Sequence, residues 1–306
     1  MLLEVKDLVK SFGDTEVLHG ISFSAESGTA LGLLGRNGAG KTTTIRILMD
    51  VFRADSGEIT LDGNPFSAGD HWIGYLPEER GLYPKKKVCE QMVYLARLRG
   101  IHKTKAMENV DYWLDRLEIS EYKNEKLEKL SKGNQQKVQL AATLVANPEI
   151  VILDEPFSGL DPVNAQLLKD VLNEMIAEGK IVIFSSHQMP LVEEFCDDIV
   201  ILNHGDVVVS GRLKDIKKEY GENRLILSSD NYSMPELRKV LESQMSDIVK
   251  IDKEKKNFFV LEQKPKVTRE RILGRLLNSS VKIEKFGVFE PSLSDIFVAK
   301  AGDEYE

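Results

Sequence analysis

A glycine-rich stretch from residue 35 to residue 43, GRNGAGKTT, constrains this chain more than any other feature. Its three glycines can adopt positive φ angles, and they leave room for backbone N–H groups to turn inward around phosphate oxygens. Lys41 would add a positive charge beside the outer phosphates, and the Thr42 hydroxyl is a hard oxygen ligand suited to Mg²⁺. The full pattern G-x-x-x-x-G-K-[ST] therefore predicts a loop that binds the phosphates of a nucleotide.

The residues on both sides of this loop have the character that it requires. Residues 29–34 (TALGLL) form a short apolar run typical of a buried strand, and residues 41–49 (KTTTIRILM) have apolar positions at helical spacing. The loop is thus expected to open a helix whose N-terminus faces the phosphates. A chance glycine turn explains the pattern less well, because it would not need a strand before it and a helix after it.

Candidate catalytic residues follow two further predicted strands. The apolar run Ile150–Leu153 is followed by Asp154 and Glu155. One such carboxylate can bind Mg²⁺, and the next can orient or deprotonate a water. A β-branched run, Lys180–Phe184, ends shortly before His187. A lone histidine after a strand is often structural, but here a contact with the γ-phosphate is expected.

Composition narrows the class of protein. A length of 306 residues suggests two domains, and 42% hydrophobic with 29% charged residues is typical of a globular chain. The formal net charge of −8 disfavours nucleic acid as a partner. The two cysteines, Cys89 and Cys196, lack metal-ligand spacing and fit a reducing cytoplasm. Neither a signal peptide nor an apolar run long enough to span a bilayer is expected.

The N-terminal part of the chain combines strands with an inserted helical segment. Alternating apolar and polar residues predict half-buried strands at Leu2–Val9 and Glu16–Ala25, with Phe12 just before the turn between them. The Phe12 ring is a candidate to stack on a purine, and a core aromatic of the hairpin is an equally compatible interpretation. From Val88 the pattern becomes helical, which indicates a helical subdomain over about residues 85–148.

The character of the sequence changes near Tyr220. The residues beyond it follow the order strand, helix, strand, strand, helix, strand, which is typical of a ferredoxin-like α+β unit. This segment contains no cluster of catalytic residue types. We therefore predict a nucleotide-binding domain over residues 1–220 and an accessory domain over residues 221–306.

The motifs occur in a characteristic order: the glycine-rich loop, Pro77-Glu78, LSKGNQQ from residue 130, ILDEP from residue 152, SGLD from residue 158, and His187. In this order they resemble the ATPase subunit of an ABC transporter, over about residues 1–215. The resemblance implies a P-loop NTPase α/β fold with a RecA-like core, an antiparallel β subdomain and the inserted helical subdomain. It also implies ATP as substrate and Mg²⁺ as cofactor.

The resemblance assigns roles position by position. It implies that Glu155 is the catalytic base, that His187 is the switch histidine, and that Lys41 acts on the phosphates. The implied ATP-binding residues are Phe12, Gly35, Arg36, Asn37, Gly38, Ala39, Gly40, Lys41, Thr42, Thr43 and Glu78. Ser131, Lys132, Gly133 and Asn134 would form the signature that acts on a partner chain, Asp161 would lie in the D-loop, and Thr42, Asp154 and Glu78 would surround the metal.

Two departures from the family pattern stand out. The usual signature is LSGGQ, and here Lys132 replaces a glycine and Asn134 replaces the glutamine. At the position after Pro77 the family usually has a glutamine. This chain has Glu78 there, which adds negative charge near a triphosphate. The stretches GYLPEERGLYP, SKGNQQK and FEPSLSDIFV resemble a subgroup of ABC-2-type exporter ATPases, which includes sodium-efflux and antibiotic-export ATPases with a similar C-terminal accessory domain.

The function that this resemblance implies is ATP hydrolysis that powers export through a separately encoded membrane permease. The partners would be a second ATPase subunit, with a homodimer expected, and the permease, which would hold the chain at the inner face of the cell membrane. One alternative is a soluble ABC ATPase acting on ribosomes or DNA, although such relatives usually carry two cassettes or a long coiled coil. Another is an ATP-sensing module that hydrolyses little.

Overall fold

The computed structural model describes residues 1–79 and 81–301. Its described residues separate into two compact units, Met1–Leu213 and Lys214–Ala299, and Lys300 groups with the first unit. Each unit has its own buried core. Among the described residues, no helix is long and apolar enough to cross a bilayer.

A six-stranded sheet forms the centre of the first unit, in the order β10-β9-β3-β8-β7-β6. Five of its strands are parallel, and β10 pairs with β9 in the antiparallel direction. Apolar and β-branched runs favour these strands, because the parallel part is buried on both faces. The strands are β3 (Ala30–Leu34), β6 (Ile73–Leu76), β7 (Ile150–Asp154), β8 (Ile181–Ser186), β9 (Asp198–Asn203) and β10 (Asp206–Arg212).

The register of this sheet places three strand ends at one edge. Leu34 at the end of β3 lies opposite Ser186 of β8, and Ser185 of β8 lies opposite Asp154 of β7. The glycine-rich loop follows β3 directly, and helix α1 (Lys41–Leu48) follows the loop. The carboxyl edge of a parallel sheet is where α/β folds bind ligands, so the register alone brings the predicted site residues together.

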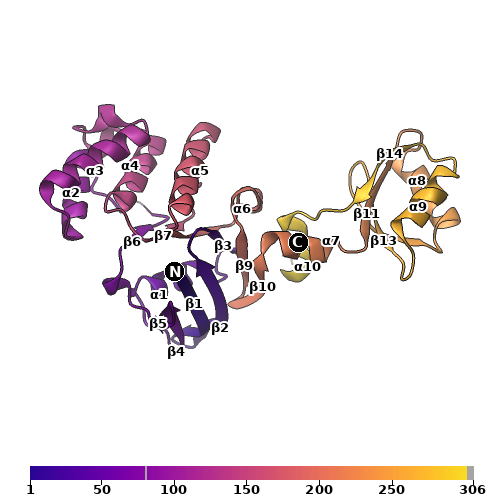
Figure 1. Ribbon diagram of the computed structural model, residues 1–306, viewed down its shortest axis with the longest axis horizontal. Coiled ribbons are helices and arrows are strands. Elements are labelled where there is room, and N and C mark those ends of the chain that lie inside the picture. Colours follow the sequence, from indigo (N-terminus) through magenta and orange to yellow (C-terminus); the bar gives the residue numbers. More distant parts are fainter. Residues whose placement is uncertain (80, 302–306) are drawn as a thin grey trace. The chain divides into compact units, whose positions relative to one another are not determined.

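A second sheet in this unit is antiparallel, in the order β2-β1-β4-β5. Its strands are β1 (Leu2–Phe12), β2 (Thr15–Glu26), β4 (Ser56–Leu61) and β5 (Asn64–Pro65). Buried side chains of this sheet, of the six-stranded sheet and of α1 form one continuous core, whose members include Val5, Leu31 and Ile45. The antiparallel sheet therefore covers one side of the nucleotide loop and its helix (Figure 1).

Helices make up the rest of the first unit. Figure 1 shows α2, α3 and α4 gathered beside β6 and β7. The helices are α2 (Val88–Leu98), α3 (Lys103–Arg116), α4 (Lys132–Leu144), α5 (Pro162–Ala177) and α6 (Met189–Phe195), with 3₁₀ turns at Ala68–Asp70, Ser120–Tyr122 and Leu127–Lys129. Ser131 caps α4 as predicted, because its hydroxyl accepts a hydrogen bond from the backbone N–H of Asn134.

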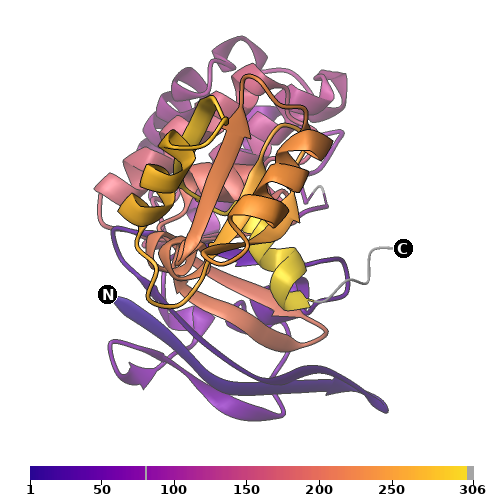
Figure 2. The ribbon, with the colours of Figure 1, turned by 90° about the vertical axis from the view of Figure 1, so that its right-hand side faces the viewer.

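The second unit contains a four-stranded antiparallel sheet in the order β12-β13-β11-β14. Helices α8 and α9 cover one face of it (Figures 1 and 2). The elements are α7 (Leu213–Gly221), β11 (Arg224–Ser229), α8 (Met234–Gln244), β12 (Val249–Glu254), β13 (Phe259–Gln263), α9 (Arg269–Leu277), β14 (Ile283–Val288) and α10 (Leu293–Ala301). This connectivity confirms the ferredoxin-like βαββαβ prediction.

Two short helices were not predicted from the sequence. Helix α6 follows His187 closely and begins with Pro190 in its first turn, and α7 joins the hairpin β9–β10 to the second unit. Each has fewer than ten residues, so the helical repeat appears in it barely twice. The structure places α7 with the second unit, whose division from the first falls at Leu213.

Helix α9 offers a local test of this fold. The Thr268 hydroxyl accepts a hydrogen bond from the backbone N–H of Arg271 and caps the helix. We expect Thr268→Ala to lower the unfolding free energy of the second unit by about 1 kcal/mol, because an N–H group in the first turn loses its acceptor. Urea unfolding monitored by circular dichroism measures this loss. Thr268→Ser is the matched control, since it retains the hydroxyl; equal loss in both variants would contradict the capping role.

Candidate functional site

The glycine-rich loop has the backbone that its sequence predicts. Gly35, Gly38 and Gly40 have φ angles of 152°, 82° and 106°. A Cβ atom at Gly40 would lie 2.6 Å from Cδ2 of Leu18, and one at Gly35 would lie 2.5 Å from the carbonyl oxygen of Leu202. The positive φ disfavours a side chain at both positions, and at Gly35 the fixed backbone oxygen also excludes one sterically.

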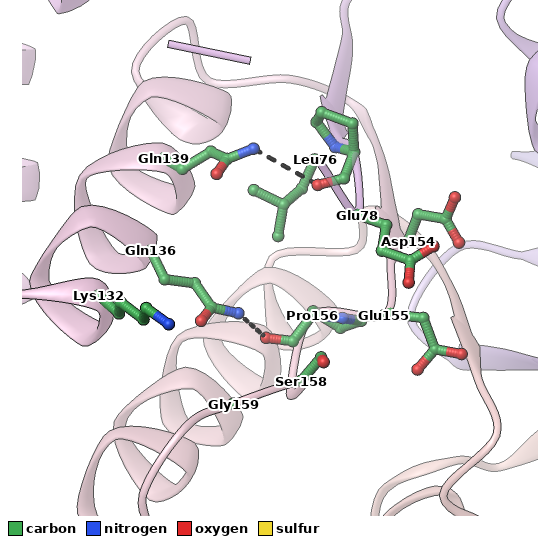
Figure 3. A pocket seen from close by; sticks show the side chains of 11 residues that line it. Leu76, Glu78, Lys132, Gln136, Gln139, Asp154, Glu155, Pro156, Ser158 and Gly159 are labelled. Carbon is green, nitrogen blue, oxygen red and sulfur yellow. Dashed lines mark hydrogen bonds between the residues drawn. The ribbon is translucent and has the colours of Figure 1, made fainter. Parts of the chain in front are cut away.

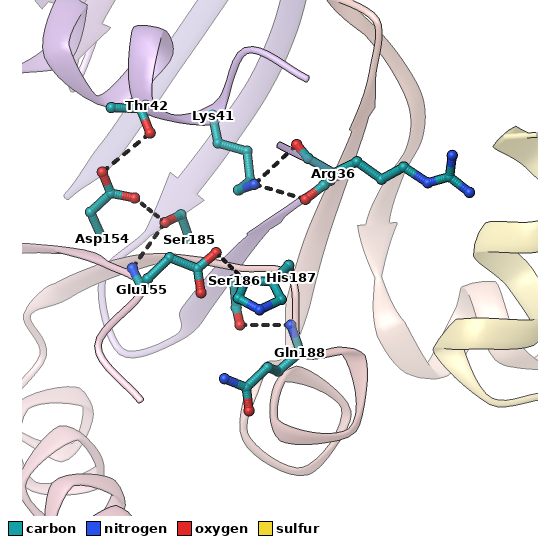
Figure 4. A network of polar contacts seen from close by, with 10 residues as sticks. Arg36, Lys41, Thr42, Asp154, Glu155, Ser185, Ser186, His187 and Gln188 are labelled. Carbon is teal, nitrogen blue, oxygen red and sulfur yellow. Dashed lines mark hydrogen bonds and ion pairs between the residues drawn. The ribbon is translucent and has the colours of Figure 1, made fainter. Parts of the chain in front are cut away.

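Lys41 lies inside this loop with its ammonium group held by backbone oxygens. Its Nζ donates hydrogen bonds to the carbonyl oxygens of Gly35 at 2.7 Å and Arg36 at 3.2 Å (Figure 4). The residue is only 6% exposed. Burial lowers the pKa of Lys41, and the nearby carboxylates of Glu155, Asp154 and Glu78 oppose that shift. The ammonium group is thus a buried positive charge close to three carboxylates, and it can attract phosphate oxygens.

Asp154 lies at the end of β7 and is 2% exposed. Its Oδ2 accepts a hydrogen bond from the Thr42 hydroxyl at 3.3 Å, and its Oδ1 accepts one from the Ser185 hydroxyl. A carboxylate beside a hydroxyl is the oxygen pair that holds Mg²⁺ in nucleotide sites, with phosphate and water completing the shell. Thr42 and Asp154 therefore fit the predicted metal position.

Glu155 follows Asp154 and adopts an unusual backbone conformation, with a φ of 50°. Its backbone N–H lies 3.2 Å from both the hydroxyl and the carbonyl oxygen of Ser185. Its Oε1 lies 2.8 Å from Nδ1 of His187, whereas its buried Oε2 has no hydrogen-bond partner among the residues that the structure describes. A 7% exposed carboxylate with one unpartnered oxygen is suited to accept a hydrogen bond from water.

Two clefts meet at these carboxylates. The first, of about 270 Å³, follows the glycine-rich loop, and the second, of about 190 Å³, lies toward helix α4 (Figure 3). Glu78, Asp154 and Glu155 line both clefts. Within the described chain, no group of three His, Cys, Asp or Glu side chains is arranged to hold a metal ion by itself.

Other predicted residues lie outside the first cleft. Phe12 is 44% exposed and packs edge-on against Phe52, so it is not a core aromatic, and its stacking on adenine stays a prediction. Ser131, Gly133 and Asn134 lie at the N-terminus of α4. Asp161 caps α5 through hydrogen bonds from the backbone N–H groups of Val163 and Asn164. The roles of these residues toward a nucleotide also stay predictions.

Three polar residues were missed in the sequence. Ser185 binds Asp154 and the backbone of Glu155. Gln136 donates a hydrogen bond to the Pro156 carbonyl oxygen at 2.8 Å, and Gln139 donates one to the Glu79 carbonyl oxygen at 3.2 Å. The signal for Ser185 was its place at the end of a strand adjacent to β7. The glutamines gave a weaker signal, because only the fold brings α4 beside these loops.

A phosphate-binding loop at the carboxyl edge of a parallel sheet defines the class of P-loop nucleotide-binding proteins. Residues 18–158 match the family described as ABC transporter. Residues 211–301 match the family described as ATP-binding protein DrrA1-3-like, C-terminal domain. The second match spans the whole of the second unit and begins within β10.

Similar proteins make the assignment more specific. The chain is 42% identical over 306 residues to the uncharacterized ABC transporter ATP-binding protein YhaQ of Bacillus subtilis, with 100% of both chains covered. It is 31% identical over 229 residues to the linearmycin resistance ATP-binding protein LnrL of the same organism, covering 74% of each. A solved structure of the ATP binding subunit of an ABC transporter has a TM-score of 0.67 and 30% identity, and the match covers 79% of this chain and 100% of that one.

The chain belongs to the family of ABC transporter ATP-binding proteins. This confirms the predicted P-loop NTPase fold and the assignment as an ATP-hydrolysing subunit of a transporter. It binds ATP, as the loop geometry and the family both require.

Ser185 provides a test of the site. We expect Ser185→Ala to lower the kcat of ATP hydrolysis roughly 10- to 100-fold, because hydrogen bonds to charged groups contribute about 1.5–3 kcal/mol. Steady-state phosphate release measures kcat, and a fluorescent ATP analogue measures binding.

Ser186→Ala is the matched control for this test. Ser186 is the next residue of β8 and equally buried, but its hydroxyl accepts from the backbone N–H of Gln188 and is not hydrogen-bonded to Asp154 or Glu155. Equal losses of kcat in the two variants would show that Ser185 acts only as a packing residue.

Proposed function

We propose that this ATP hydrolase powers export through a separately encoded permease, and that two copies close head to tail around Mg-ATP. The observation that supports the proposal best is the Glu155 carboxylate, which is buried, hydrogen-bonded to His187 on one oxygen and unpartnered within the described chain on the other. It lies in the cleft that the glycine-rich loop also lines. A general base must be buried beside the phosphates and must have an oxygen that can accept a proton from the attacking water.

Residues of the loop and of the neighbouring strand ends would then each have a physical role in hydrolysis. Lys41 would place its charge against the β- and γ-phosphates, and the inward N–H groups of the loop would stabilise charge that develops there. Thr42 and Asp154 would hold Mg²⁺, which withdraws negative charge from the phosphate oxygens. Glu155 would orient and deprotonate the attacking water, with His187 fixing its carboxylate near the γ-phosphate.

The head-to-tail arrangement rests on the position of the signature. Ser131 and Gly133 lie at the N-terminus of α4, and neither lines the cleft of the glycine-rich loop in the same chain. A helix N-terminus carries partial positive charge and exposed N–H groups, which favour a phosphate. We therefore infer that this end of α4 approaches the γ-phosphate bound by a second copy.

Export and membrane attachment are supported by the relatives. The C-terminal match to the DrrA1-3-like domain and the similarity to a protein named for linearmycin resistance favour an exporter. The chain would then work at the inner face of the membrane by binding the permease. The net charge of −8 weighs against action on nucleic acid.

Glu155→Gln tests the proposed base and the dimer together. The change keeps shape and hydrogen-bonding reach but removes nearly all basicity, so hydrolysis should slow roughly 10²- to 10⁴-fold while ATP binding persists. ATP retained between two chains should convert a mostly monomeric protein into a stable dimer, and ADP should not. Size-exclusion chromatography with light scattering, beside a phosphate-release assay, measures both effects.

Two further variants serve as controls for this experiment. Lys41→Ala should lose both binding and hydrolysis, and Glu149→Gln, an exposed carboxylate before β7, should match the wild type. A Glu155→Gln protein that hydrolyses at the wild-type rate would contradict the base. One that binds ATP and stays monomeric would contradict the two-chain site. Wild-type protein that binds ATP without phosphate release would instead favour an ATP-sensing module.

We propose that the second unit regulates ATP hydrolysis or couples it to the permease. The first unit alone would carry out the nucleotide chemistry. A chain ending at Leu213 should retain ATP affinity within about twofold, because every residue of the phosphate cleft precedes that point and the two units have separate cores. Isothermal calorimetry measures the affinity. A folded truncation that no longer binds ATP would show that the second unit is part of the nucleotide site.

A further inference from the structure

One face of α4 is turned toward the nucleotide site. Lys132, Gln136 and Gln139 follow the spacing i, i+4 and i+7, which places them on the same side of a helix. Gln136 donates to the Pro156 carbonyl oxygen, directly after Glu155. Gln139 donates to the carbonyl oxygens of Pro77 at 3.4 Å and Glu79 at 3.2 Å, on either side of Glu78. The two glutamines therefore hold this face of α4 against both acidic segments.

Lys132 is the first residue on that face. Figure 3 shows its side chain extending from α4 toward the side of the pocket where Glu78, Asp154 and Glu155 lie. Lys132 and Glu78 both line this cleft of about 190 Å³. Within the described part of the chain, neither side chain takes part in a hydrogen bond or an ion pair. Two opposite charges thus line one cavity, and Glu78 is also close enough to Lys41 to affect its pKa.

Helix stability does not explain a lysine at this position. Lys132 is the first residue of α4, where the helix dipole is positive, and no acidic side chain lies in the first turn. A cation there is unfavourable, because it meets the positive end of the helix dipole. Its position in the cleft that Glu78 also lines offers another explanation.

We propose that Lys132 is a positioning residue that acts through Glu78. Its ammonium group attracts the Glu78 carboxylate toward α4, which keeps that negative charge away from the triphosphate. Glu78 lines the phosphate cleft as well as the α4 cleft, so its side chain can be drawn to either. Repulsion between a carboxylate and phosphate oxygens would weaken ATP binding if this attraction were lost. The inference rests on the proposed function of the site.

A cycle of variants separates this role from direct action on a phosphate. Lys132→Met removes the charge and keeps most of the side-chain volume, and it is made both in the natural chain and in the Glu78→Gln background. If Lys132 acts through Glu78, Lys132→Met should raise the KM for ATP about fivefold beside Glu78 and less than about twofold beside glutamine, as expected for a solvent-accessible pair. Kinetics are measured with the full chain.

Further measurements test whether the effect of Lys132 depends on its charge. Lys132→Arg should retain the natural KM, because it keeps the charge. The fivefold effect should shrink when salt rises from about 0.05 M to about 0.5 M, since the charges are screened. Lys126→Met and Glu79→Gln are matched controls, because these exposed residues carry the same charges and line neither cleft, so neither change should alter KM.

Equal effects of Lys132→Met in the two backgrounds would overturn the proposal, and so would the absence of any effect beside Glu78. A KM raised equally by Lys132→Arg and Lys132→Met would also overturn it. In each of these cases the proposed function would still stand if the wild type hydrolyses ATP and Lys41→Ala abolishes that hydrolysis. Absence of hydrolysis in the wild type would instead contradict the proposed function, which separates the two failures.

Discussion

The burial of one cation and two carboxylates at a single sheet edge is the constraint on which the site depends. Lys41, Asp154 and Glu155 are all less than 10% exposed. Removing an ion from water costs several kcal/mol unless polar partners replace the lost solvent. Backbone oxygens of the loop replace it for Lys41, and the hydroxyls of Thr42 and Ser185 replace it for Asp154. These partners come from the loop after β3, from α1 and from β8, so the charges are tolerated only while these three segments keep their relative positions.

The same constraint explains the backbone of Glu155. A non-glycine residue with positive φ is strained by about 1–3 kcal/mol and persists only where surrounding contacts hold it. Ser185 provides two such contacts, through its hydroxyl and its carbonyl oxygen. The conformation turns Glu155 away from the direction of Asp154, so adjacent carboxylates face different partners, a hydroxyl pair and His187. The strained residue thus lies where two adjacent carboxylates have different hydrogen-bond partners.

Much of this site could be predicted from local sequence. The glycines, Lys41, Thr42, Asp154, Glu155 and His187 each follow a strand pattern, and parallel strands bring their carboxyl ends together. Ser185 was missed because a serine has no chemistry of its own until a neighbouring strand places a carboxylate beside it. Gln136 and Gln139 were missed because their partners are backbone oxygens some 20 and 60 residues away. Helices α6 and α7 were missed because each is too short to show a repeat.

Polar contacts link α4 to the nucleotide site. The hydrogen bonds of Gln136 and Gln139 reach loops that carry Glu155 and Glu78, and each net hydrogen bond contributes only about 1 kcal/mol. A bidentate ion pair between Arg116 of α3 and Glu174 of α5 is a further polar link between the helical segment and the rest of the unit. Contacts of this strength hold an orientation without making it permanent. The orientation of α4 therefore depends on the two loops that carry Glu155 and Glu78, because Gln136 and Gln139 bind the backbone oxygens of those loops.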